Sequence, residues 1–133
     1  MKGYTSLSQS KRLAEILPIE SADMWWNFYS VTTDDTTPQI IHLDTPWVGS
    51  FNWDNKPDNV PCWSLVALLD IIPYAIHKSD NEFYRLEIDK GYNDYAIWYS
   101  NNGLTVNDLD VTFDNFVDAC VEMIIKLHEQ NLL

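Results

Sequence analysis

The sequence predicts a single α+β domain over residues 1–133, in which three helices pack on one face of a small, mainly antiparallel four-stranded sheet. The chain has the length of one average domain, and 46% of its residues are hydrophobic, which is enough to form one core. Two pairs of strand-like segments predict two hairpins, and each hairpin precedes a helix with apolar residues at offsets 0, 3, 4 and 7. These residues are Cys62, Leu65, Val66 and Leu69 in one helix, and Cys120, Met123, Ile124 and Leu127 in the other.

The predicted order is helix, hairpin, helix, hairpin, helix. The first helix follows Ser6 or Ser8, because either hydroxyl can accept a hydrogen bond from an unpaired backbone N–H at a helix start. Pro18 ends this helix, since a proline disfavours the helical conformation of the residue before it. Residues 24–31 and 39–43 are rich in aromatic and β-branched side chains, which favours two strands joined as a hairpin.

The segment 44–60 contains prolines, Asn and Asp without any periodicity, and we expect a long loop there. The second helix begins at Pro61 or Cys62 and ends at Ile72. Asn59 is its expected cap, and Pro61 occupies a first-turn position where the missing N–H costs nothing.

The second hairpin is the clearest of the predicted elements. Residues 83–88 and 95–99 alternate between apolar and polar side chains and are joined around Gly91. The third helix runs from Phe113 to about Gln130 and turns its apolar face, Phe113 included, to the core. We expect one shared core to contain Val66, Leu69, Cys120, Ile124 and Leu127. A duplicated strand–strand–helix unit is an alternative explanation of the two matched helices.

The net charge of the chain limits the classes of partner that we expect it to bind. Asp and Glu number 20 against 8 Lys and Arg, for a net charge of -12. Such a field repels nucleic-acid phosphates and anionic membranes, so we expect no direct binding to nucleic acid or membrane. The N-terminus has no apolar signal region and no apolar run is long enough to span a bilayer, which predicts a soluble cytoplasmic protein.

No residue pattern predicts a catalytic, cofactor-binding or metal-binding site. Cys62 at a helix start would have a lowered thiol pKa, but a nucleophile also needs a base, and its neighbours favour burial. Asp54 and Asp58 lie in a segment that lacks the glycine and the bidentate Glu of a calcium loop. We therefore expect a protein that is not an enzyme, with a Cys62 nucleophile as the alternative.

Two groups of residues are candidates for binding a partner. Aromatic side chains in the long loop can contact a protein partner or stack on a sugar, or can fold back over the sheet as a lid. These are Trp47, Phe51 and Trp53. Acidic residues lead into the third helix and follow its four-residue spacing, which suits either a docking face for a basic partner or a solvated face with Glu122 paired to Lys126. These are Asp108, Asp110, Asp114, Asp118 and Glu122.

Four motifs of the chain carry a resemblance to a family of proteins. They are SQSKRLAEILP at 8–18, ESADM at 20–24, PCWSL followed by ALL at 61–69, and DACVEM at 118–123. On these motifs the chain resembles a family of small uncharacterised proteins encoded by gut Bacteroides-type bacteria, their phages and mobile elements. The resemblance implies a stand-alone cytoplasmic domain associated with phage or mobile DNA, and it carries no activity, cofactor or catalytic residue.

Taken together, these observations predict a small, acidic, non-enzymatic interaction protein, or adaptor, that binds another protein with a basic surface. The alternative is an acidic mimic of nucleic acid that inhibits a nucleic-acid enzyme, since a row of carboxylates can imitate a phosphate backbone. The oligomeric state is left open by the sequence.

Overall fold

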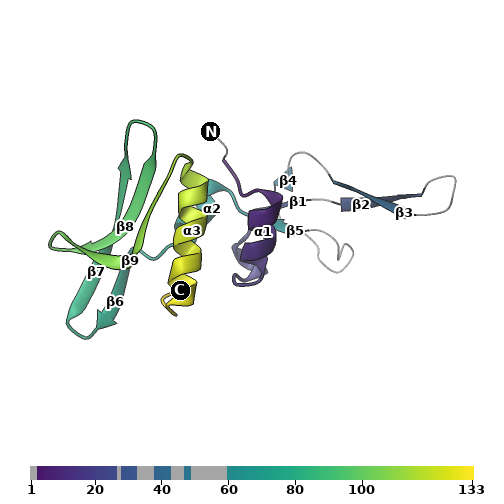
Figure 1. The fold of residues 1–133 in the computed structure, drawn as a ribbon. Coiled ribbons are helices and arrows are strands. Elements are labelled where there is room, and N and C mark those ends of the chain that lie inside the picture. The colour runs from purple at the N-terminus through teal and green to yellow at the C-terminus, as the bar shows by residue number, and fades with distance from the viewer. Residues whose placement is uncertain (1–2, 27, 33–37, 43–46, 49–59) are drawn as a thin grey trace.

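The computed structural model describes residues 3–26, 28–32, 38–42, 47–48 and 60–133. The burial of side chains is described for residues 3–26 and 60–133, except 107. Within these residues the fold is α+β, as predicted (Figure 1). Its helices are α1 (Leu7–Ala14), the 3-10 turn η1 (Ile19–Ser21), α2 (Leu65–Ile71) and α3 (Phe116–Glu129). Its strands are β1 (Met24–Trp26), β2 (Phe28–Thr32), β3 (Pro38–His42), β4 (Trp47–Val48), β5 (Val60–Cys62), β6 (Ala75–Ser79), β7 (Glu82–Lys90), β8 (Tyr95–Asn101) and β9 (Leu104–Phe113).

The strands of the described residues form three antiparallel sheets, so the prediction of one sheet built from two hairpins is wrong. The predicted first hairpin exists as β2–β3, but it is a sheet of its own, and the predicted strand 24–31 is divided, because Met24–Trp26 forms β1 in another sheet. The second hairpin is extended on both sides into the four-stranded sheet β6-β7-β8-β9. Figure 1 shows these two sheets at opposite ends of the molecule with the helices between them.

The small sheet β4-β1-β5 replaces part of the predicted loop. Trp25 of β1 pairs with Trp47 of β4 on one side and with Pro61 of β5 on the other. The predicted loop 44–60 therefore contains β4 and the first residue of β5. The two pairings bring Trp25 next to residues 22 and 36 positions further along the chain, which no local pattern predicts.

The main core lies between the four-stranded sheet and α3. In β8, Ile97 and Tyr99 are fully buried on the face that α3 covers, while the residues between them lie on the other face. From α3, the buried face is Val117, Ala119, Cys120, Val121, Met123, Ile124, Ile125 and Leu127. The prediction that Cys120, Ile124 and Leu127 share one core is confirmed.

The start of α2 differs from the prediction. Pro61 and Cys62 are strand residues paired with β1, and the helix begins at Leu65. Its cap is Ser64, whose Oγ accepts a hydrogen bond of 3.2 Å from the backbone N–H of Ala67. The expected cap Asn59 lies outside the described residues.

The later start changes which face of α2 is buried. Leu68 is fully buried, Leu69 is half-buried, and Val66 is exposed over 69% of its surface. The prediction that Val66 lies in the core is therefore wrong. Every residue from 65 to 69 is apolar, so offsets alone fit two helical faces, and packing against α3 selects the face with Leu68.

The N-terminal caps of α1 and α3 set where these helices begin. At α1, Ser6 and Gln9 form a reciprocal capping box, which confirms one of the two predicted caps. At α3, Asn115 accepts hydrogen bonds from two backbone N–H groups and starts the helix at Phe116. Phe113, predicted as a buried helix residue, is instead the last residue of β9 and is exposed over 37% of its surface.

Candidate functional site

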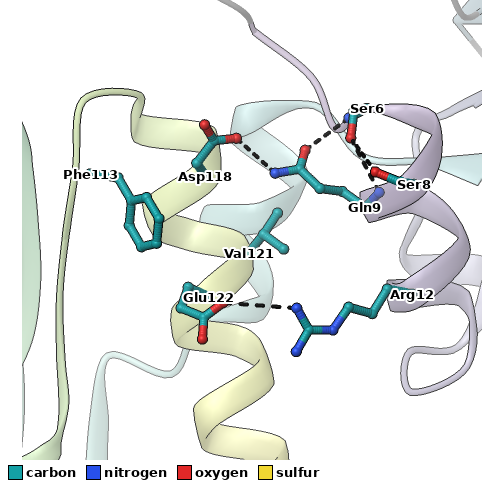
Figure 2. A pocket seen from close by; sticks show the side chains of 8 residues that line it. All are labelled: Ser6, Ser8, Gln9, Arg12, Phe113, Asp118, Val121 and Glu122. Carbon is teal, nitrogen blue, oxygen red and sulfur yellow. Dashed lines mark hydrogen bonds and ion pairs between the residues drawn. The ribbon is translucent and has the colours of Figure 1, made fainter.

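A groove lies between α1 and α3. It includes acidic residues that were predicted on the third helix. It has a volume of about 440 Å³ (Figure 2). Its lining is Ser6, Ser8, Gln9, Arg12, Phe113, Asp118, Val121 and Glu122. Two of the five predicted acidic residues, Asp118 and Glu122, therefore lie in one groove.

Asp118 is held at the α1 end of the groove by Gln9. The Gln9 side-chain N–H donates to Asp118 Oδ1 at 2.7 Å, and its carbonyl oxygen accepts from the Ser6 backbone N–H at 2.9 Å. One amide side chain thus joins the cap of α1 to the first turn of α3, as Figure 2 shows. The carboxylate also lies near the positive end of the α3 dipole, where its charge is favourable.

Glu122 has a looser partner. The Arg12 guanidinium extends from α1 toward it, with a nitrogen–oxygen distance of 3.9 Å (Figure 2). The Arg12 side chain is exposed over 57% of its surface and that of Glu122 over 33%. An ion pair of this length and exposure contributes between 0 and about 1 kcal/mol, so a competing cation can replace Arg12 at little cost.

Apolar surface accompanies the charges. Val121 is buried between the two helices, and the partly exposed ring of Phe113 enters from the end of β9. Tyr95 of β8 pairs with Phe113 across the strands, and its own ring stacks on Phe116 with the centroids 5.1 Å apart. Aromatic surface and carboxylates therefore meet at the N-terminal end of α3.

The other predicted acidic residues lie elsewhere. Asp114 is exposed in the turn between β9 and α3, outside the groove lining. Asp108 is exposed in β9, where it adopts a positive φ of 72° within an irregular stretch of pairing with β8. Asp110 lies between the buried Leu109 and Val111, so it projects from the face of the sheet opposite α3. The acidic residues therefore do not form the expected continuous row, because side chains of a strand alternate between the two faces of the sheet.

The aromatic candidates of the loop are only partly visible. Trp47 lies in β4, where its backbone pairs with that of Trp25. Phe51 and Trp53 lie outside the described residues. Their role in binding stays a prediction.

The Cys62 side chain is packed in the interior of the protein. It is fully buried, and its sulfur lies 3.4 Å from Thr5 Oγ1 and 3.5 Å from the Thr5 carbonyl oxygen, to which the thiol donates. Burial raises the pKa of the Cys62 thiol, and this effect exceeds the lowering by hydrogen bonds from Thr5 and Ser10. The predicted lowering of its pKa is wrong, because Cys62 lies in β5 and precedes α2.

Several groove residues were not singled out by sequence reasoning. Gln9 and Arg12 were seen only as helix residues, although the serine three positions before Gln9 is the sequence signature of the capping box. Nothing local indicates that Gln9 contacts a residue 109 positions away. Their role in the groove follows from the packing of α1 beside α3.

Comparison with known proteins transfers no activity to the chain. No protein-family model, curated protein sequence or solved structure gives a significant match. Within the described ranges, no three His, Cys, Asp or Glu side chains gather as metal ligands do. Nor does any helix in that part of the chain have the length and apolar character needed to cross a membrane.

Proposed function

We propose that this protein is a small non-enzymatic adaptor that binds a basic segment of another protein in the α1–α3 groove. The observation that carries the proposal is the presence of two carboxylates, Asp118 and Glu122, beside the exposed ring of Phe113 in one hollow. This combination suits a Lys or Arg side chain, whose long apolar stem packs on apolar surface while its charged head reaches a carboxylate.

In the free protein, the carboxylate of Glu122 already faces a basic side chain. Arg12 of the same chain extends across the groove to it, and a partner's basic side chain would take the place of Arg12. The exchange costs little because the existing pair is long and exposed. Arg12 would then turn to solvent or to a carboxylate of the partner.

The net charge of -12 supports rapid association with a basic partner. A field of one sign steers an oppositely charged surface toward its site and raises the association rate, and added salt screens the effect. We therefore expect the partner to bind more slowly as ionic strength rises. The shared motifs described above suggest a cytoplasmic adaptor in phage or mobile-element biology as its setting.

The geometry favours the adaptor over the mimic of nucleic acid. A mimic needs carboxylates repeated along one surface, as phosphates are along a strand. In this fold Asp110 and Asp118 belong to opposite sides of the four-stranded sheet. The groove instead offers a short acidic site with apolar walls, which suits one or two side chains of a protein.

The test compares what three versions of the protein retain from a lysate of the native host. The first is the wild type, and the second carries Asp118→Asn with Glu122→Gln, which removes both negative charges of the groove with little change in side-chain size. The third carries Asp80→Asn with Glu129→Gln, two exposed acidic residues outside the groove, and has the same net charge as the second.

Quantitative mass spectrometry then separates groove binding from general charge effects. We expect at least one protein to be retained by the wild type and by the Asp80/Glu129 variant and to be depleted about fivefold or more with the groove variant. The proposal is wrong if every retained protein is depleted equally by the two variants or by neither. Circular dichroism spectra of the three proteins check that all are folded.

A further inference from the structure

The four-stranded sheet has a second face, on the side away from the helices. Figure 1 shows α3 and α2 on one side of β6–β9, and no described element covers the other side. Side chains reach this outer face from the positions between the buried ones. In the middle of the sheet these are Glu87 of β7, Trp98 of β8 and Asp110 of β9.

These three residues form a row across adjacent strands. Glu87 pairs with Trp98, and Trp98 pairs with Asp110, so a half-buried indole lies between two exposed carboxylates. Directly paired residues have Cβ atoms about 5 Å apart, which places both carboxylates within reach of one group bound on the indole. Asp89, exposed two positions after Glu87, adds a third negative charge to the same face.

A hollow of about 450 Å³ continues the row toward one end of the sheet. It is lined by Phe83, Arg85, Glu87, Ser100, Asn101, Asn102 and Gly103. Glu87 belongs to both the row and the hollow, so the two form one continuous surface. The hydroxyl of Ser100 and the amides of the two Asn can hydrogen-bond a peptide backbone, because they offer both donors and acceptors.

The face already contains one contact between a cation and an aromatic ring. The guanidinium carbon of Arg85 lies 6.0 Å from the centroid of the Phe83 ring. Trp98 offers a larger and more strongly attracting ring than Phe83. Unlike Phe83, it has a carboxylate in the paired position on each side.

We propose that the outer face of the sheet binds an arginine side chain of a partner protein, carried on an extended segment. The guanidinium stacks on the indole of Trp98 and donates hydrogen bonds to Glu87 and Asp110. The neighbouring backbone of the segment enters the hollow beside Ser100 and Asn101. Arginine suits this site better than lysine because its planar group can stack on a ring and bond a carboxylate through two N–H groups.

This surface is separate from the α1–α3 groove and lies on the opposite side of the sheet. The inference therefore goes beyond the proposed function and stands whether or not the groove binds a partner. With both surfaces active, the protein joins two basic segments. If the two segments belong to one partner, the second binding event is intramolecular and strengthens the first.

The test is a titration of the isotope-labelled full chain with short peptides, followed by NMR. The probe is acetyl-Gly-Arg-Gly-amide, and the matched peptides replace arginine by citrulline, which is neutral and of similar shape, or by lysine. We expect the arginine peptide to shift the indole N–H of Trp98 and the amides of Glu87 and Asp110. The citrulline peptide should produce no such shifts, and the lysine peptide should bind more weakly.

Variants then assign the binding energy. Glu87→Gln with Asp110→Asn should weaken arginine-peptide binding about fivefold or more, since two ion pairs are lost together. The control Asp80→Asn with Glu129→Gln has the same net charge and should change affinity less than twofold. Asp118→Asn with Glu122→Gln should leave the shifts at Trp98 unchanged, which separates this surface from the groove.

Three results would overturn the proposal. The first is equal binding of the arginine and citrulline peptides. The second is an equal loss of affinity in the Glu87/Asp110 variant and in its charge-matched control. The third is equal binding of the lysine and arginine peptides, which would remove the assignment to arginine.

Discussion

Two neighbouring residues of α2 provide a direct test of how this helix is buried. Leu68 is fully buried against the core, whereas Val66 is exposed over 69% of its surface. The sequence pattern predicts the reverse importance, because Val66 belongs to the apolar set at offsets 0, 3, 4 and 7 and Leu68 does not. Replacing each residue by Ala therefore distinguishes the two descriptions.

The expected magnitudes differ by a wide margin. Leu68→Ala removes three carbon atoms from a site with no solvent contact, which should lower the free energy of unfolding by about 2–5 kcal/mol. Val66→Ala removes two carbon atoms that face mostly water, and Ala has the higher helix propensity. Its effect should stay within about 0.5 kcal/mol in either direction.

Urea unfolding followed by circular dichroism measures both values. The slope of the unfolding free energy against urea should be the same for wild type and variants, so that a shift in the midpoint reports stability alone. If Val66→Ala cost more than about 1 kcal/mol while Leu68→Ala cost less than about 0.5 kcal/mol, α2 would be rotated relative to this structure. The buried face would then be the one that the sequence pattern predicts.

Two further predictions concern the buried thiols. Cys62 and Cys120, both fully buried, should react with a thiol reagent only after unfolding, as measured by the absorbance of the released group; rapid labelling of native Cys62 would contradict its packing against Thr5. Burial raises the pKa of Cys120 from 9.0 to about 12, so the native state retains this proton longer than the unfolded chain. Protonated Cys120 therefore contributes its full stability below pH 9.0, and the free energy of unfolding falls by up to about 4 kcal/mol as the pH rises from 9.0 to about 12. In Cys120→Ala, unfolding measured over the same pH range should lack this part of the fall.

The sequence by itself determines the elements whose causes are local. The cap of α1 is visible as Ser6 followed three positions later by Gln9, and the structure forms that capping box. The β7–β8 hairpin is visible in alternating side chains on either side of Gly91. The buried face of α3 is visible because polar residues separate its apolar positions, which leaves one helical face as the solution.

The sequence also identified Asp118 and Glu122 as candidate site residues, and their helical spacing is a local property. It did not identify their neighbours in the groove. The contact between Gln9 and Asp118 joins residues 109 positions apart, and periodicity carries no information about such a pair. The row of Glu87, Trp98 and Asp110 likewise depends on strand register, which is set by pairing between segments.

Only the tertiary structure decided the start of α2, the division of the strands into three sheets and the side of the sheet on which each acidic residue lies. From Pro61 to Leu69 almost every side chain is apolar, so the same letters suit a strand followed by a short helix or one longer helix. Pairing with β1 fixes the first two of these residues, Pro61 and Cys62, as part of β5. A choice between two locally acceptable conformations is made by contacts with distant segments, and a single sequence read in order contains no direct record of those contacts.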